Sequence, residues 1–193
     1  MPCCVHGCAD SGAVLHSHEN HVSLVEGTLM DHLFTPWRMD YIRSSKQDGC
    51  IFCDMLEMED CAALILCRGK HAFLVMNRYP YNNGHFMAVP YRHVHTVEEL
   101  TSEEMAEVMA LLAAGVTALR NAWNPEGFNI GANIGAAAGA GVKDHVHLHV
   151  VPRWVGDTNF MSVLGETRVI PQTLEQAYDE ISAALASVKQ AGA

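Results

Sequence analysis

Basic side chains are scarce in this sequence, and their scarcity argues against one class of partner. The 193 residues carry 12 lysines and arginines against 22 aspartates and glutamates, a formal net charge of −10. A protein that binds duplex nucleic acid needs a basic face to neutralise phosphates, so we expect no nucleic-acid partner. A small anionic ligand stays possible, because backbone amides and histidines in a local pocket can hold phosphate on an acidic protein.

Long apolar runs and a basic-then-apolar leader are also missing. No run approaches the roughly 20 residues that span a bilayer, so we expect no membrane partner. Because there is no leader and the seven cysteines are odd in number, the sequence favours a reducing compartment, the cytoplasm. In that compartment paired cysteines more often hold a metal than form a disulfide.

The composition is otherwise that of a globular protein, with 49% hydrophobic and 18% charged residues. Residues 1–32 hold cysteines and histidines but little large apolar surface, which predicts a disordered N-terminal extension. The remainder, residues 33–193, is long enough for one buried core and shows no internal repeat, so we expect a single domain.

Periodicity along that domain predicts strands and helices. Residues 71–76 and 84–89 are apolar runs joined by a turn-rich link, which favours an antiparallel hairpin. Residues 128–133 predict a further strand. Thr101 and Glu104 form a capping-box pattern at the start of a long helix. Its predicted buried stripe, methionines included, is Met105, Val108, Met109, Leu112, Val116, Leu119 and Trp123, and that of a last helix is Leu174, Tyr178, Ile181, Leu185 and Val188.

Three histidines alternate with apolar residues at His145, His147 and His149. Side chains alternate across a strand, so the three would share one face. Imidazole can bind a metal, transfer protons near neutral pH or attack phosphorus. The row therefore predicts a metal site or a catalytic site, with a solvated face as the alternative.

Two other features carry chemistry. The small residues 135–141 come just before the histidines, and such a backbone can approach a ligand and turn its N–H groups toward an anion. A plain connector is the alternative. Cys50 and Cys53 form a Cys-x-x-Cys pair, which predicts a zinc site if two more ligands, commonly histidines, are nearby. A redox pair or a chance spacing is the alternative.

The run from His145 to Val151 resembles the His-φ-His-φ-His-φ-φ signature of the histidine triad (HIT) superfamily, in which φ is an apolar residue. Residues 77–85, 90–93, 127–141 and 152–161 resemble one branch of it, the bacterial diadenosine-tetraphosphate phosphorylase-like proteins, which are related to the fragile-histidine-triad hydrolases. The resemblance implies an α+β fold, with an antiparallel sheet of about five strands, a long packed helix and a C-terminal helix. It also implies a homodimer.

The activity implied by this resemblance is cleavage of a dinucleoside polyphosphate at the α-phosphate. His147 would attack the phosphorus and form a nucleotidyl-histidine, which water or phosphate then resolves, so hydrolysis and phosphorolysis both stay open. Attack needs one bare nitrogen, so the other nitrogen of His147 is expected to donate its proton to a backbone carbonyl. His149 would contact the phosphate oxygens. The alternative function is a purine-nucleotide-binding or signalling protein, or a nucleoside phosphoramidase, with little polyphosphate turnover.

Further residues match positions around the nucleotide in this family: Asn77, Asn133, Gly139, Gly141, Arg153 and Trp154. Arg153 would pair either with a distal phosphate or with an acidic neighbour. Trp154 would either stack on a base or pack at a dimer interface.

The resemblance also implies a structural zinc ion. Its ligands would be Cys50, Cys53, His93 and His145, with His95 as an alternative to His93. The triad histidines would then differ in role, His145 binding the metal while His147 and His149 face the nucleotide.

Overall fold

A computed structural model gives the structure of the chain, and it describes residues 49–157 and 170–191. The extension expected at residues 1–32, the domain start at residue 33 and the resemblance at residues 158–161 lie outside these ranges.

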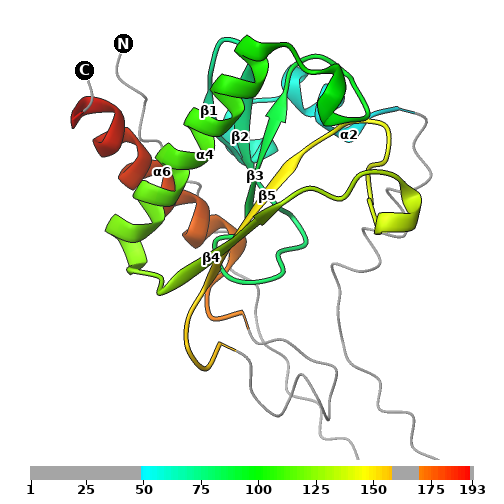
Figure 1. Cartoon of the computed structure of the whole chain (residues 1–193). Helices are drawn as coiled ribbons and strands as arrows, with labels where there is room; N and C mark the ends of the chain where they lie inside the picture. Colours follow the sequence, from blue (N-terminus) through cyan, green and yellow to red (C-terminus); the bar gives the residue numbers. More distant parts are fainter. Residues whose placement is uncertain (1–48, 158–169, 192–193) are drawn as a thin grey trace, which may run out of the picture. The chain divides into compact units, whose positions relative to one another are not determined.

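The described residues contain a five-stranded antiparallel sheet with strand order β1-β2-β3-β5-β4 (Figure 1). Its strands are β1 (Ile65–Arg68), β2 (Ala72–Met76), β3 (Phe86–Pro90), β4 (Gly127–Gly131) and β5 (Leu148–Arg153). The predicted hairpin is confirmed, because β2 and β3 are antiparallel neighbours with Phe73 opposite Val89. The expected α+β class with about five strands is likewise confirmed.

The histidine strand starts later than the sequence pattern suggests. β5 begins at Leu148, where pairing with Ala88 of β3 starts. His145 and His147 lie in the segment before it, which is tied to the loop after β3 by the bond from Val146 N–H to Val94 O, 2.7 Å. The alternation of apolar and polar residues is that of a strand, but the pairing of β3 with β5 ends at Ala88, although β3 itself continues to Pro90.

Two long helices, α4 (Ser102–Trp123) and α6 (Leu174–Ala191), pack against each other and against the same face of the sheet (Figure 1). The capping box of α4 is confirmed, because Thr101 accepts from Glu104 N–H and Glu104 accepts from Thr101 N–H. The short elements are α2 (Ile51–Asp54), η1 (Met55–Glu57), α3 (Asp60–Ala63), η2 (Val97–Glu99) and η3 (Ala136–Ala138).

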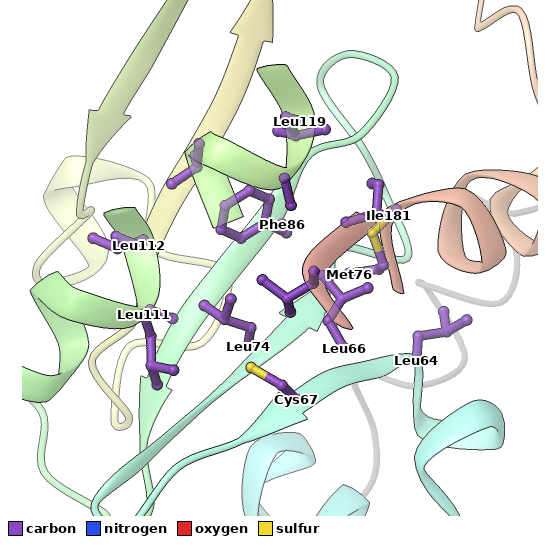
Figure 2. Packing of buried hydrophobic residues seen from close by; sticks show 14 of the residues in the cluster. Leu64, Leu66, Cys67, Leu74, Met76, Phe86, Leu111, Leu112, Leu119 and Ile181 are labelled. Atoms are coloured by element: carbon purple, nitrogen blue, oxygen red, sulfur yellow. The ribbon is translucent and has the colours of Figure 1, made fainter. Parts of the chain in front are cut away.

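The buried face of α4 differs from the predicted stripe. Met105 and Met109 are 45% and 51% exposed, so the expectation that they belong to the core is wrong. The face of α4 that carries Gly115 is turned toward the sheet. A Cβ added at Gly115 would lie 2.4 Å from Cζ of Phe86. This close approach buries the following set of α4 residues: Val108, Leu111, Leu112, Gly115, Ala118 and Leu119. Figure 2 shows Phe86 of β3 packed among the labelled leucines of this layer and Ile181 of α6.

By length and composition alone, α4 is apolar enough to cross a membrane. No segment of this kind was expected from the sequence. The core helix of a globular domain passes the same test. Leu112 and Leu119 are 1% and 0% exposed against the sheet layer, which is the packing of a core helix.

The opposite face of the sheet carries a second apolar layer and the histidines. Phe73, Val75 and Met87 form this layer together with Phe52 of α2. Met87 is the cross-strand partner of His149, so His149 emerges at the edge of the same layer. The face not covered by α4 and α6 is therefore the one that bears the candidate site.

Candidate functional site

Cys50, Cys53, His93 and His145 converge, although up to 95 residues separate them in the chain, and their ligand atoms all lie within 4.8 Å of one another. Nδ1 of His145 is 3.2 Å from Sγ of Cys50 and 3.7 Å from Sγ of Cys53, and Nδ1 of His93 is 3.4 Å from Sγ of Cys53. Ligands at the corners of a zinc tetrahedron are about 3.5 Å apart, given bond lengths near 2.1 and 2.3 Å. The four side chains therefore have the identity and spacing of a closed zinc site.

Burial and the pairing of two thiols decide the protonation of this cluster. Burial and the neighbouring Cys50 thiol raise the pKa of Cys53 to about 11. A divalent cation among the four groups would reverse this effect, because a coordinating thiol is deprotonated by the charge of the metal.

Hydrogen bonds around the cluster orient the His145 ring and anchor the segment that carries His93. Nε2 of His145 donates to Pro90 O at 2.9 Å, which leaves Nδ1 turned toward the cysteines. A histidine that binds a metal commonly donates its other ring N–H to a carbonyl in this way. Next to His93, Arg92 donates to both carboxylate oxygens of Glu104, at 2.9 and 2.7 Å, and so ties the ligand loop to the N-terminus of α4. His95 instead pairs with Glu99 at 3.1 Å, so the geometry selects His93 over His95.

His147 is 4% exposed and is held by one hydrogen bond, from Nδ1 to His145 O at 2.8 Å. A carbonyl only accepts, so the proton is on Nδ1 and Nε2 is bare. Burial lowers the pKa of His147, which keeps the imidazole neutral near neutral pH. The expected carbonyl partner is therefore present, and the ring has a nitrogen lone pair available.

His149 is oriented by His85, whose role the sequence pattern did not reveal. Tyr81 N–H donates to Nδ1 of His85 at 3.0 Å, so the proton of a neutral His85 is on Nε2. That nitrogen lies 2.9 Å from Nδ1 of His149 and donates to it. Nε2 of His149 then carries its proton as a donor. Burial lowers the pKa of His149 to about 4 and that of His85 to about 3.

The rings of the three signature histidines are linked by close contacts. His147 and His149 have centroids 4.8 Å apart, and the ring of Phe52 contacts both His145 and His147, at 5.5 and 4.9 Å. Phe52 was not singled out by the sequence either, although its position between two cysteines places it near any metal they share.

The two asparagines follow β2 and β4, two strands that are separated in the sheet by β3 and β5. Asn77 follows β2, accepts from Tyr79 N–H at 2.9 Å, and places its amide nitrogen 3.3 Å from Nδ1 of His85. Asn133 is half-buried and comes two residues after Gly131, the cross-strand partner of His149. Both strands thus lead toward the histidines.

The glycine loop is partly closed on itself. Gly139 has a φ of +81° and donates its N–H to Ala136 O at 3.0 Å, and Ala138 N–H donates to Gly135 O at 3.2 Å. Because these amides already have partners, an anion at Gly139 would contact the loop only if that bond opened. Gly141 is exposed and is closer to His145 in the sequence.

Arg153 takes the second of its two alternatives and pairs with an acidic neighbour. Asp157 accepts from Nε and the terminal nitrogen of Arg153 at 2.6 and 2.8 Å. It also accepts from Asn82 at 2.9 Å and from Trp154 N–H at 3.2 Å. Tyr81, Asn129, Val151 and Arg153 line a pocket of about 220 Å³ beside this cluster.

Comparison with known proteins places this geometry in a family. The HIT domain model matches residues 59–155. The chain is 42% identical over 154 residues to an AP-4-A phosphorylase of Mycobacterium tuberculosis, covering 75% of this chain and 79% of that one. It is 30% identical over 105 residues to the adenosine 5'-monophosphoramidase hnt1 of Schizosaccharomyces pombe, covering 54% of this chain and 74% of that one.

Solved structures agree with this assignment. A zinc-bound histidine triad family protein from Mycobacterium smegmatis superposes with a TM-score of 0.61 at 27% identity, covering 74% of this chain and 97% of that one. The sheet order, the alternating histidines and these matches lead to one conclusion. The chain belongs to the HIT family of histidine triad proteins.

Proposed function

We propose that this protein is an enzyme that cleaves dinucleoside polyphosphates, such as diadenosine tetraphosphate, at the α-phosphate through a nucleotidyl-His147 intermediate. One observation carries the proposal: Nδ1 of His147 donates to His145 O at 2.8 Å, so the buried ring presents a bare Nε2. The 42% identity to an AP-4-A phosphorylase supports this substrate class.

The reaction takes two displacements. The lone pair of His147 Nε2 attacks the α-phosphorus, and the bond from that phosphorus to the bridging oxygen breaks. The departing polyphosphate keeps the electron pair. His149 donates a hydrogen bond from Nε2 to the phosphate oxygens, on which negative charge builds up. An oxygen of phosphate or water then attacks the same phosphorus and breaks the P–N bond. Phosphate gives a nucleoside diphosphate, whereas water gives a monophosphate.

The nucleotide is proposed to lie against the face of the sheet that carries the histidines. Its contacts are proposed to come from Asn77, Asn133, Gly141 and Trp154, from Gly139 once its bond to Ala136 O opens, and indirectly from Arg153. Arg153 belongs to this set as the partner of Asp157, which also fixes the backbone of Trp154.

Zinc is the proposed metal of the cysteine–histidine cluster. Four protein ligands close the coordination shell, which suits a structural rather than a catalytic ion. Bound there, it would supply a cross-link between the Cys50–Cys53 loop and His145. Thiolate ligands of this kind favour a reducing compartment, so we propose the cytoplasm.

A homodimer is proposed on the grounds of an exposed sheet edge. β4 is an edge strand of the described sheet, and Ile130 on it is 51% exposed, as is Met109 on α4. An apolar edge strand of this kind is suited to pairing with a second copy. Light scattering should give twice the mass of the chain, and Ile130→Lys should give the monomer.

The alternative function is that of a nucleoside phosphoramidase, favoured by the resemblance to the hnt1 enzyme. It would use the same His147 attack on a P–N rather than a P–O–P substrate.

Product analysis separates these activities. The protein is incubated with diadenosine tetraphosphate, with and without phosphate, and with adenosine 5'-phosphoramidate, and the nucleotides are separated. ADP with ATP, formed only with phosphate, establishes phosphorolysis. AMP with ATP, formed without phosphate, establishes hydrolysis. Turnover of the phosphoramidate alone would replace the proposed substrate class. An absence of turnover in all three incubations would contradict the proposal that the protein is an enzyme.

A further inference from the structure

Phe52 joins the metal-binding cluster to the histidine proposed to attack phosphorus. It lies between Cys50 and Cys53 in the chain and is 1% exposed. Its ring centroid is 4.9 Å from that of His147, with 49° between the planes, and 5.5 Å from that of His145, with 76° between the planes. One side chain therefore contacts two of the three signature histidines.

The position of Phe52 is fixed from both sides. Its backbone belongs to α2, where Asp54 N–H donates to Cys50 O at 2.9 Å. Cys50 and Cys53 on either side approach Nδ1 of His145 at 3.2 and 3.7 Å. The ring itself enters the apolar layer of the sheet with Ile65, Val75 and Met87. The ring cannot shift unless α2 or this apolar layer shifts with it.

His147 needs such a contact, because the one hydrogen bond that its ring makes to the described residues is from Nδ1 to His145 O, at 2.8 Å. A single hydrogen bond fixes one atom of an imidazole but leaves the ring free to tilt about that atom. Nε2, on the far side of the ring, moves most when the ring tilts. In-line attack requires this atom to be about 3–3.5 Å from the phosphorus with its lone pair aligned.

We propose that Phe52 is a positioning residue for His147: it packs against the imidazole and holds Nε2 on the line of attack. The inference rests on the proposed role of His147 as the nucleophile. Through Phe52, the segment from Cys50 to Cys53 would contribute to catalysis even though its sulfur atoms do not contact the substrate.

If Phe52 were purely structural, its removal would affect stability and activity as much as the removal of another ring in the same layer. Phe73 is a suitable ring for this comparison. Phe73 belongs to the same buried cluster and is 0% exposed, but its ring stacks on Tyr91 at 5.5 Å. Phe52→Leu and Phe73→Leu therefore remove the same atoms from the same layer, and the former alone takes a ring from His147.

The experiment compares these two variants of the full chain, with Phe52→Met as a third that refills the space beside the cysteines. Zinc content, Tm, KM and kcat are measured with diadenosine tetraphosphate and phosphate. We expect full zinc content throughout and a similar fall in Tm for both leucine variants. In Phe52→Leu and Phe52→Met kcat should fall about ten-fold with KM within about two-fold, whereas Phe73→Leu should keep kcat within about two-fold.

A second readout does not depend on turnover. The Nδ1–H proton of His147 gives an NMR signal that should remain sharp in Phe73→Leu and broaden in Phe52→Leu, as the ring gains freedom to tilt. Equal kcat values in the Phe52 and Phe73 variants would overturn the inference, and so would a loss of kcat that follows zinc content. His147→Ala distinguishes the two proposals: if it stays active, the proposed function fails, whereas if it is inactive while Phe52→Leu is fully active, this inference alone fails.

Discussion

Nε2 of His85 donates to Nδ1 of His149 across 2.9 Å, although 64 residues separate the two histidines in the chain. Tyr81 N–H fixes the tautomer of His85 from its other side. The pair therefore fixes the proton of His149 on Nε2, which can act as a donor. His85 is 0% exposed, and a second proton, on Nδ1, would break the bond that this nitrogen accepts from Tyr81 N–H.

The first prediction concerns acid stability. Burial lowers the pKa of His85 from 6.5 to about 3, so the unfolded chain takes up this proton before the folded one does. The free energy of unfolding must then fall as pH drops from about 6.5 toward about 3, with a loss on the order of 2 kcal/mol from His85 by pH 5.

In His85→Gln the amide can still accept from Tyr81 and donate to His149 but does not titrate. Its Tm should fall less between pH 7 and pH 5 than that of the wild type, and equal falls would contradict the assignment.

A second prediction concerns the metal. Cys53→Ser removes a thiolate from the four-ligand cluster, so zinc content should drop well below the roughly one ion per chain expected of the wild type. The Tm should fall with it, and a chelator should lower the Tm of the wild type in the same way. Cys61→Ser is the control, because Cys61 is an exposed free cysteine outside the cluster. Full zinc content in Cys53→Ser, measured by atomic absorption, would rule out this ligand set.

The third prediction concerns the Arg153–Asp157 pair. Asp157 accepts from Arg153, Asn82 and Trp154 N–H, so Asp157→Asn and Arg153→Met should each destabilise the fold, by about 1 kcal/mol for a partly exposed pair. The double variant should be less destabilised than the sum of the two. Urea unfolding measures all three. Additive losses would mean that the pair is not coupled, and a KM raised only in Arg153→Met would place the guanidinium on the substrate itself.

The fourth prediction concerns the seam between α4 and the sheet. Alanine normally favours a helix over glycine by about 1 kcal/mol. At Gly115, however, the added Cβ would lie 2.4 Å from Cζ of Phe86, so Gly115→Ala should destabilise the fold by about 1–3 kcal/mol. Phe86→Leu in the same chain should recover part of that loss, because it removes the atoms in conflict. An increase in Tm for Gly115→Ala alone would show that the helix can move away from the sheet.

Much of the site could be predicted because its residues are local in sequence or belong to a recognisable pattern. The spacing of His145, His147 and His149, the Cys50–Cys53 pair and the carbonyl partner of His147 all follow from short stretches. His85 could not be assigned a partner in this way, because its bond to His149 depends on how β3 and β5 pair. The available signal was the place of His85 at the start of the apolar run 84–89.

Within the fold, the hairpin and the capping box followed from turn and capping chemistry. The buried face of α4 did not, because two exposed methionines have the same spacing as core residues. Its orientation is set by the contact of Gly115 with Phe86, which has no counterpart in hydrophobic periodicity. The start of β5 was missed for a related reason, since it depends on where pairing between β3 and β5 stops, at Ala88 and Leu148, rather than on the histidine pattern.

The central claim is that His147 Nε2 forms a covalent bond to the α-phosphorus. It is tested by mixing the protein with diadenosine tetraphosphate without phosphate, quenching at early times in alkaline denaturant, which preserves phosphohistidine-type bonds, and mapping the adduct by mass spectrometry. We predict an AMP adduct on the peptide that contains His147, localised to that histidine, lost when phosphate is added before the quench, and absent from His147→Ala. An adduct on another residue, or a His147→Ala protein that turns over at the wild-type rate, would contradict the account.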